Sequence, residues 1–556
     1  MNNKKRAAEL IHSVYGSDVG DPLLERIWAM LPDRENASAV ERNDCMLITY
    51  ANSIVAESEV PLRSLKRFLD THVGSVFGRL HVLPFFPWSS DDGFSVIDYR
   101  MVDHQYGSWA DIEALERDYD LMFDLVINHC SRESLWFADF VSGRDPGRHY
   151  FITLLEGSDV SSVARPRSTP LISAVHTYSG IRHVWNTFSS DQVDLDFGNP
   201  DVLCEFVDIL FFYIARGARL IRLDAIGYLW KRLGTGCLNL PETHALVKLF
   251  RVLVDEAAPG VQLITETNVP HEQNVSYFGA SDEAHMVYQF SLAPLLLYSY
   301  VFGDSTYLTS WAQRLEDPPP GATFLNFFAS HDGIGLRPLE GVIPEANVDQ
   351  LVERMHAKGG FVTTREVNGA QQRPYEINIS LMSALGGSDG MAAFLGAHAL
   401  LLSFRGSPAF YIHSLLGTMN DLDLVEQTGR TRSINRRMWS MHDLQRELDN
   451  PGSIQSRALA GTKQLVARRN QQPALLPDAD QRVLPATPGI FAMYRTCPTQ
   501  TLLVVASVVA QPQRISVGQL DLPAGQYADA LTGRTVTVSD RLELGPYEVV
   551  WLDLGR

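Results

Sequence analysis

Two charged side chains interrupt an otherwise apolar run in the segment RLIRLDAIGY, residues 219–228. The run is typical of a strand buried on both faces, where an isolated charge costs several kcal/mol or more. Because side chains two apart on a strand point to the same side, Arg222 and Asp224 emerge together. If the strand ends at the mouth of a barrel, we expect the arginine to offset the cost of burying Asp224 and to hold it there for a reaction.

Three further apolar runs end in polar or charged side chains of the same kind. They carry Asp124, Asn128 and His129, then Glu266, and then His331 and Asp332. An Asp and a Glu from adjacent strands, about 5–5.5 Å apart, support double displacement with retention at the anomeric carbon of a sugar. That chemistry needs one ionised carboxylate as nucleophile and one protonated carboxyl as general acid. We expect Arg222 to lower the pKa of Asp224 and a drier setting to raise the pKa of Glu266.

A structural role is the alternative interpretation of each cluster taken alone. An Arg-x-Asp sequence is often a structural ion pair, and a single histidine is often a satisfied polar residue. Four clusters, each at the carboxyl end of a strand, are typical of an active site on a barrel.

Eight short apolar strands are expected, and amphipathic segments such as NPDVLCEFVDILFFYIARG (199–217) separate most of them. The strands are expected to begin near residues 45, 80, 121, 219, 262, 286, 324 and 408. Alternation of strand and helix predicts an α/β fold with a parallel sheet, and eight such units predict a (β/α)8 TIM barrel.

Two intervals between the strands are too long for simple loops, and they predict an inserted subdomain after the third strand and a second insertion after the seventh. Two short helices, over residues 4–14 and 22–30, are expected before the first strand. Short strands separated by turn residues near the end of the chain predict an all-β C-terminal domain. The predicted parts are an N-terminal helical extension (1–44), the barrel (45–129, 201–332 and 375–470), an inserted B subdomain (130–200), a second insertion (333–374) and the C-terminal β domain (471–556).

The composition narrows the possible partners. The 556 residues include 65 acidic and 47 basic side chains, which give a formal net charge of -18 and disfavour binding to nucleic acid or to an anionic membrane. The five cysteines are scattered and form no CxxC pair, which favours a reducing, cytoplasmic location. The basic N-terminus lacks the apolar stretch of a signal peptide, and no window of about 18 apolar residues predicts a membrane span.

Four short segments together resemble the signature regions of the α-amylase superfamily, glycoside hydrolase family 13. These segments are DLVINH (124–129), IRLDA (221–225), TETN (265–268) and ASHD (329–332). Further segments resemble the sucrose phosphorylase group within that family. They are LPFFPWSSDDGFSVIDY (83–99), NHCSRES (128–134), RLDAIGYLWKRLGTGC (222–237), HDGIGLRPLEGVIP (331–344), YEIN (375–378) and INRR (434–437). Members of this group transfer an α-glucosyl unit between a small acceptor and phosphate, with α-D-glucose 1-phosphate as one product.

The resemblance implies roles for particular residues. It makes Asp224 the nucleophile, Glu266 the general acid/base and Asp332 the stabiliser of the transition state. The residues implied to bind substrate are Asp91, Phe94, His129, Arg222, His331, Arg436, Tyr375 and Glu376. Calcium-dependent amylases carry a Lys-His pair after the nucleophile strand, where this chain reads Ala-Ile-Gly-Tyr (225–228). No metal or other cofactor is therefore expected, and inorganic phosphate is a substrate.

The sequence departs from the sucrose phosphorylases where the acceptor should bind. Tyr375-Glu376 replaces a usual Tyr-Gln, Arg373 stands just ahead of it, and TETNVPH (265–271) replaces a Pro-Glu-Ile-His type of sequence. These stretches and the N-terminal extension look more like the branch that acts on glucosylglycerate. Arg373, Arg165 and Arg167 could meet the glycerate anion or phosphate, or could be solvated loop residues. Glu376 adds an opposing charge, so sucrose and glucosylglycerol remain alternative substrates.

Two other functions stay open from the sequence. A hydrolase or transglucosidase would use the same three carboxylates with water or a sugar as acceptor. A non-catalytic amylase-like binding protein would require the loss of a catalytic carboxylate, and Asp224, Glu266 and Asp332 are all present. The expected partners are a small α-glucoside and phosphate, and the expected assembly is a monomer or homodimer.

Overall fold

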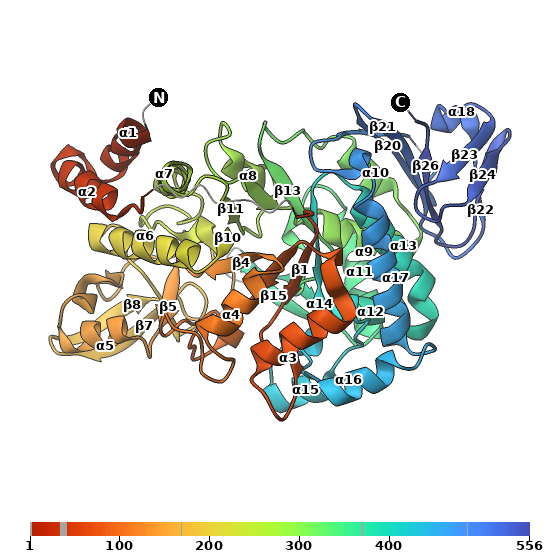
Figure 1. Cartoon of the computed structure of the whole chain (residues 1–556). Coiled ribbons are helices and arrows are strands. Elements are labelled where there is room, and N and C mark those ends of the chain that lie inside the picture. The colour runs from red at the N-terminus through yellow and green to blue at the C-terminus, as the bar shows by residue number, and fades with distance from the viewer. Residues whose placement is uncertain (1–2, 34–41, 168, 368–370, 486, 556) are drawn as a thin grey trace.

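The computed structural model describes residues 3–33, 42–167, 169–367, 371–485 and 487–555. Eight parallel strands close into a barrel at the centre of the molecule (Figure 1), which confirms the predicted (β/α)8 fold. In chain order they are β1 (Met46–Thr49), β3 (Arg79–Val82), β4 (Asp120–Leu125), β10 (Ala218–Leu223), β11 (Gln262–Thr265), β12 (Met286–Tyr288), β13 (Thr323–Phe327) and β17 (Ser407–Tyr411). Each lies within a residue or two of an expected strand.

Helices surround the barrel and bury its outer surface. The larger ones are α3 (Pro61–Phe68), α4 (Trp109–Glu116), α6 (Pro200–Ala215), α7 (Pro241–Ala257), α9 (Leu292–Phe302), α13 (Met391–Ser403) and α17 (Ile454–Arg469). The barrel strands are buried almost throughout, because the helices cover one face and the barrel interior covers the other. This burial accounts for their nearly continuous apolar sequences.

Two insertions emerge at the carboxyl ends of the barrel strands. The first follows β4 and contains the strand pair β5 (His129–Ser131) and β9 (Gln192–Asp194), with a small sheet of β6 (Thr153–Leu154), β8 (Gly180–Trp185) and β7 (Ile172–Thr177). The second follows β13 and contains α11 (Glu345–Ala357) and a sheet of β14 (Ile334–Gly335), β16 (Gln371–Asn378) and β15 (Phe361–Val367). Both insertions contribute residues to the site described below.

An N-terminal helix pair packs on the outside of the barrel. Helix α1 (Asn3–Tyr15) lies against α7, and α2 (Ser17–Met30) lies against α6 (Figure 1). The two helices lie where the sequence predicted them. At the end of α1, Tyr15 donates a hydrogen bond of 2.7 Å to the Phe197 carbonyl and meets the Trp230 ring edge-on. The pair therefore braces the segment that follows β10.

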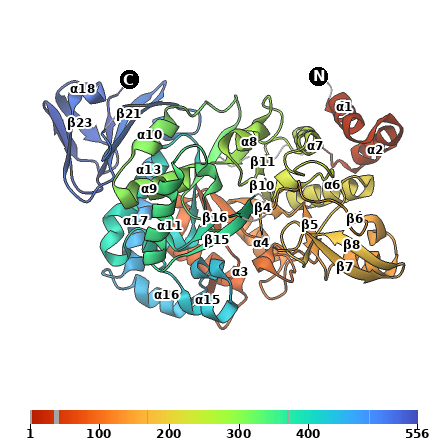
Figure 2. The ribbon, with the colours of Figure 1, turned by 180° about the vertical axis from the view of Figure 1, so that it is seen from behind.

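The described part of the C-terminal domain is all-β apart from the short α18 (Val517–Leu520) and one 3-10 turn. Its six-stranded sheet lies beside α13 in both views (Figures 1 and 2). In sheet order the strands are β19 (Asp480–Val483), β20 (Ile490–Cys497), β21 (Gln500–Ser507), β26 (Val549–Asp553), β23 (Gly525–Asp529) and β24 (Thr535–Val538). Gly396 of α13 allows the close approach, because a Cβ there would lie 2.4 Å from the Tyr547 carbonyl oxygen. The sheet thus packs directly on a barrel helix.

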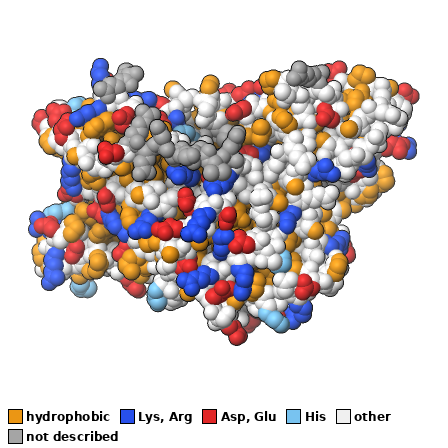
Figure 3. All heavy atoms as spheres, in the orientation of Figure 1, with side chains coloured by type: hydrophobic (Ala, Val, Ile, Leu, Met, Phe, Trp, Pro, Cys, Tyr) orange, Lys and Arg blue, Asp and Glu red, His pale blue; other side chains and the backbone are white. Residues whose placement is uncertain are grey.

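Acidic and basic side chains are interspersed over the face shown in Figure 3. Within the described part of the chain, no helix is both long enough and apolar enough to cross a membrane.

Candidate active site

A cavity opens at the carboxyl ends of the barrel strands. Side chains at the end of β10 and in the segments after β3, β4, β10, β11 and β13 line it, together with residues of both insertions. The predicted site residues in its lining are Asp91, Phe94, His129, Arg167, Arg222, Asp224, Glu266, His331, Asp332, Tyr375 and Glu376. The barrel therefore brings together residues that are up to 285 positions apart in the chain.

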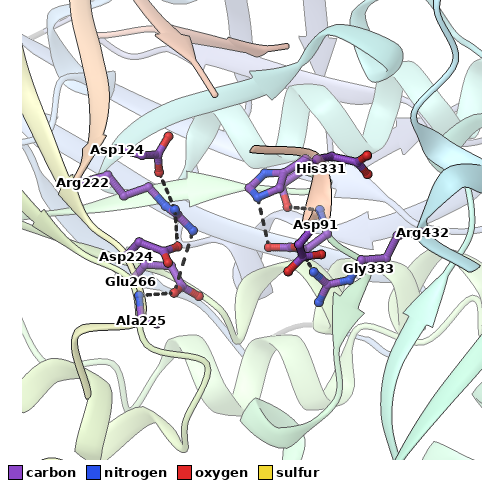
Figure 4. Close-up of polar contacts among 12 residues, drawn as sticks. Asp91, Asp124, Arg222, Asp224, Ala225, Glu266, His331, Gly333 and Arg432 are labelled. Atoms are coloured by element: carbon purple, nitrogen blue, oxygen red, sulfur yellow. Dashed lines mark hydrogen bonds and ion pairs between the residues drawn. The ribbon is translucent and has the colours of Figure 1, made fainter. Parts of the chain in front are cut away.

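One guanidinium connects three carboxylates at the base of the cavity (Figure 4). Arg222 donates to Asp224 at 2.7 Å and to Asp124 at 2.5 Å, and it lies 3.8 Å from a Glu266 oxygen. The Ala225 backbone N–H also donates to Glu266, at 3.2 Å. Figure 4 shows Asp224 and Glu266 side by side, with His331 and Asp91 across the site from them. The strand therefore tolerates Arg222 because the surrounding carboxylates balance its charge inside the barrel.

The buried position of Asp224 favours the protonated form of its carboxyl. Burial raises the pKa of its carboxyl to about 8, because Arg222 only partly opposes burial and the charges of Glu266, Asp124 and Asp332 raise the pKa further. Burial also raises the pKa of Glu266. Arg222 does lower the pKa of Asp224, as predicted, but burial raises this pKa more, so the expected low pKa is not found. The two carboxyls together hold a proton near neutral pH, as a nucleophile and acid pair requires.

The backbone is strained where it presents these side chains. Asp91, Asp92 and Ala225 have φ of 55°, 51° and 50°, in the left-handed region that residues with a Cβ seldom adopt. Ala225 follows Asp224 directly, and its left-handed turn lets its N–H reach Glu266. Such strain persists only where the surrounding structure holds it, and it is typical of functional sites.

Asp332 lies close to a histidine and two arginines. His331 is 3.3 Å from its carboxylate, Arg432 is 2.5 Å away and Arg436 is 3.7 Å away. Burial raises the pKa of Asp332, but these three residues and Arg222 lower it more, so the net shift is downward. Burial lowers the pKa of His331 to about 3, so this imidazole is neutral. Asp332 is therefore ionised at any pH at which the fold is expected to operate.

Opposite the carboxylate pair, Asp91 forms the other polar wall of the cavity. It accepts hydrogen bonds from Arg167 at 3.0 Å and Gln192 at 3.2 Å. The Phe94 ring stacks on His331 with centroids 5.0 Å apart. Carboxylate, imidazole and aromatic face are suited to holding the hydroxyl groups and apolar face of a sugar ring.

Arg432 is a site residue that the sequence analysis missed. Besides Asp332, it contacts Glu376 through two hydrogen bonds of 2.9 and 2.6 Å, and Glu376 also accepts from the Gly333 N–H at 3.0 Å. The charge of Glu376 is thus neutralised within the site. Arg436 lies behind this group, where its Nε donates to the His331 carbonyl at 2.9 Å. The TRSINRR segment (431–437) contains both arginines, but it is irregular, so its spacing did not reveal which of them enters the cavity.

Two of the three arginines expected at the acceptor lie outside the cavity lining. Arg373 pairs with Glu345 of α11 at 2.8 Å, and Arg165 donates to the Thr169 carbonyl. Arg373 and Tyr375 would share a face of a regular strand, but the register shifts between Thr363 and Thr364 of β15, so that Tyr375 is the extra residue of a β-bulge. The bulge turns Tyr375 into the cavity and leaves Arg373 on the other side.

A buried lysine joins the first insertion to the barrel. The Lys231 ammonium lies 2.6 Å from both Asp194 of β9 and the Asn128 side-chain oxygen, and both charged side chains are at most 5% exposed. Among the described residues, no group of three or more His, Cys, Asp and Glu side chains could hold a metal ion. The positive charge that balances Asp194 at this junction is that of Lys231.

Replacing Lys231 by Met is expected to lower the free energy of unfolding by about 3–5 kcal/mol, because it leaves the Asp194 carboxylate buried without a cation. Denaturant unfolding of the two proteins measures the difference. Lys66→Met is the matched control, since its ammonium bridges the half-exposed Asp70 and Asp118, and its loss should cost about 1 kcal/mol or less. Equal losses in the two variants would contradict a special role for Lys231.

Comparison with known proteins agrees with this geometry. A family model of the α-amylase catalytic domain matches residues 77–312. A glucosylglycerate phosphorylase of Spirochaeta thermophila is 40% identical over 99% of both chains, and one of Escherichia coli is 37% identical over 99% of this chain and 100% of that protein. The crystal structure of sucrose 6F-phosphate phosphorylase from Thermoanaerobacter thermosaccharolyticum has a TM-score of 0.74 and 25% identity, over 85% of this chain and 96% of that one. By fold, site and full-length similarity, the chain belongs to the sucrose phosphorylase group of the α-amylase superfamily, glycoside hydrolase family 13.

Proposed function

We propose that this enzyme reversibly phosphorolyses glucosylglycerate to α-D-glucose 1-phosphate and glycerate, with retention of configuration. The main support for the proposal is that Asp224, Glu266 and Asp332 lie in one cavity. Asp224 and Glu266 both lie there beside the same guanidinium, that of Arg222. Two relatives that match nearly the whole chain are named glucosylglycerate phosphorylases. A non-catalytic binding protein would not need this set of carboxylates.

The first half-reaction breaks the glycosidic bond. Ionised Asp224 attacks the anomeric carbon and forms a β-glucosyl ester, while protonated Glu266 gives its proton to the departing glycerate oxygen. Arg222 contacts both residues, and its closer position at Asp224 favours the assignment of the negative charge to Asp224 and of the proton to Glu266. Glycerate then leaves with the proton from Glu266.

The second half-reaction uses hydrogen phosphate in place of glycerate. A phosphate oxygen attacks the anomeric carbon, the bond to Asp224 breaks, and the phosphate proton returns to Glu266. Because each step inverts the anomeric centre, the product keeps the α-configuration. Asp332, ionised and held by Arg432 and His331, stabilises the positive charge that develops on the sugar in both transition states. The reaction requires no metal and no other cofactor.

The donor glucosyl ring lies against the cavity wall that Asp91, Phe94, His129 and His331 form. Arg436 lies behind this wall, where it donates to the His331 carbonyl. The acceptor lies toward the second insertion, where Tyr375 and Glu376 line the cavity. Because Arg432 neutralises Glu376, this carboxylate does not oppose an anionic acceptor. Arg167 is the remaining predicted phosphate ligand that reaches the cavity. A cytoplasmic location and a monomeric or homodimeric state belong to this proposal as well.

Phosphate dependence tests the proposed reaction. With glucosylglycerate as substrate, α-D-glucose 1-phosphate should accumulate in proportion to added phosphate, and little free glucose should form without it. Chromatography of the products with and without phosphate measures both sugars. Release of free glucose at the same rate in both samples would identify a hydrolase and reject the phosphorylase.

A further inference from the structure

Arg337 is a cation beside the cavity that lacks a carboxylate partner among the described residues. It lies in the turn Arg337–Leu339, which directly follows β14. Its sequence neighbours Leu336 and Pro338 are apolar. Toward the described residues its side chain donates only a long hydrogen bond of 3.4 Å, to the Asn268 carbonyl, and its Nε is buried without a partner among them. A guanidinium of this kind retains most of its capacity to bind an anion.

Contacts on both sides connect Arg337 to the cavity. Leu336 donates its backbone N–H to the Tyr375 carbonyl at 2.9 Å, and Tyr375 lines the cavity. Gly335 lies against the Asn268 amide, since a Cβ at Gly335 would be 2.8 Å from its nitrogen. Asn268 lines the cavity too, and its side-chain oxygen is buried without a hydrogen-bond partner. Arg337 itself is not among the residues that line the cavity, but it contacts Asn268, which is, so the polar groups at this edge of the cavity are not fully satisfied by the protein.

Tyr228 belongs to the same edge of the cavity. It lines the cavity, and burial raises the pKa of its hydroxyl to about 12, while Arg337 and Arg365 lower this pKa and Glu266 raises it. The charges of Glu266 and of both arginines therefore act on this hydroxyl. Arg365 has a carboxylate partner, Glu340 at 2.6 Å, so Arg337 is the less committed of the two cations.

We propose that Arg337, together with Asn268 and Tyr228, binds the carboxylate of the acceptor and selects glycerate over neutral acceptors. The inference rests on the proposed function and names the residues that give it its specificity. The carboxyl carbon of glycerate is one or two bonds beyond the carbon that bears the reacting oxygen. When that oxygen meets Glu266, the carboxylate stays close to Glu266, and Asn268, two residues further along the chain, lines the same cavity.

Of the residues that the structure describes, three arginines line the cavity, and all three are already paired with carboxylates. Arg432 is held by Asp332 and Glu376, and Arg222 by Asp224 and Asp124. Arg167 pairs with Asp91 on the opposite wall. An acceptor carboxylate at Arg337 would not have to displace a protein carboxylate, and this difference in electrostatic cost favours Arg337.

Acceptor competition in the synthetic direction tests the inference. With α-D-glucose 1-phosphate as donor, kcat/KM is measured for glycerate and for glycerol in the wild type, Arg337→Ala, Arg337→Lys and Arg373→Ala. Loss of a charge-assisted hydrogen bond should lower the glycerate-to-glycerol ratio about 10- to 100-fold in Arg337→Ala. Arg337→Lys keeps the charge without the planar fork, so it should retain part of the preference. Arg373→Ala is the matched control outside the cavity, and its ratio should equal that of the wild type.

The outcomes separate the inference from the function on which it rests. An unchanged ratio in Arg337→Ala, or an equal fall in Arg373→Ala, overturns the assignment of the carboxylate to Arg337. Equal losses with both acceptors and a raised KM for α-D-glucose 1-phosphate show that Arg337 serves phosphate and overturn it as well. A wild type that uses glycerol as well as glycerate rejects glucosylglycerate as the substrate, whatever the variants do. If Arg337→Ala fails to fold, the ratio in Arg337→Lys decides, because a preference equal to that of the wild type speaks against fork-like binding.

Discussion

Replacing Asp224 by Asn is expected to lower kcat for phosphorolysis by on the order of 10⁴-fold or more, because no ester to glucose can form without the carboxylate. Mass spectrometry adds a direct test. After incubation with an α-glucosyl donor and rapid acid quenching, the wild type should carry a glucosyl group on the peptide that contains Asp224, and the variant should not. Turnover within tenfold of the wild type would remove Asp224 from its role.

The same variant should fold as well as the wild type or better. Arg222 keeps its contact with Asp124, so the substitution leaves no buried arginine unpaired. Burial raises the pKa of Asp224 from 3.8 to about 8 and also raises the pKa of Glu266, so the folded pair holds a proton, shared between the two carboxyls, that the unfolded state releases. Asp224 therefore costs stability increasingly as the pH rises from about 4 to about 8. The gain in melting temperature of Asp224→Asn should widen over that interval, and a gain that shrinks as the pH rises would contradict the raised pKa.

Replacing Glu266 by Gln should slow the reaction of glucosylglycerate much more than the reaction of α-D-glucose 1-phosphate. We expect kcat/KM for phosphorolysis of glucosylglycerate to fall by about 10²–10⁴-fold, because the departing glycerate oxygen no longer receives a proton. Phosphate leaves as a stable anion without such help, since its second pKa is about 6. The exchange of labelled phosphate into α-D-glucose 1-phosphate, measured without an acceptor, should therefore fall much less.

Glu345→Gln is the matched control for this experiment, because Glu345 pairs with Arg373 outside the cavity. Both reactions should keep their wild-type rates in that variant. Equal losses of phosphorolysis and exchange in Glu266→Gln would show that Glu266 acts on the shape of the site rather than by proton transfer.

The barrel and its carboxylates were predictable because both depend on local sequence. Parallel strands with both faces buried are short apolar runs, and the carboxyl end of each strand is fixed by the strand itself. Asp224, Glu266 and Asp332 each stand within five residues of a barrel strand, so finding the strands placed all three at one end of the barrel. The resemblance to known enzymes then supplied their roles.

The acceptor side was harder to predict because its geometry depends on irregular backbone. One β-bulge at Tyr375 decides that Arg373 points away from the cavity, and in the sequence QQRPYEIN only Pro374, a residue that strands accept at edges and bulges, hints at its position. Arg432 lies in a 3-10 turn, where no simple periodicity assigns a face. The pKa of Asp224 depends first on its burial and then on the charges that surround it, which are properties of the assembled barrel.

The pairing of β1 with β17 closes the barrel, and it joins Met46 to Ala409. At about 5–20 residues per second, a ribosome needs on the order of 20–70 s to pass from the first of these strands to the second. Throughout that time the nascent chain has one unpaired edge on β1, whose four residues are buried in the finished fold. During synthesis, therefore, other groups must cover this edge of β1 early, or the chain must fold into the barrel only after β17 has emerged.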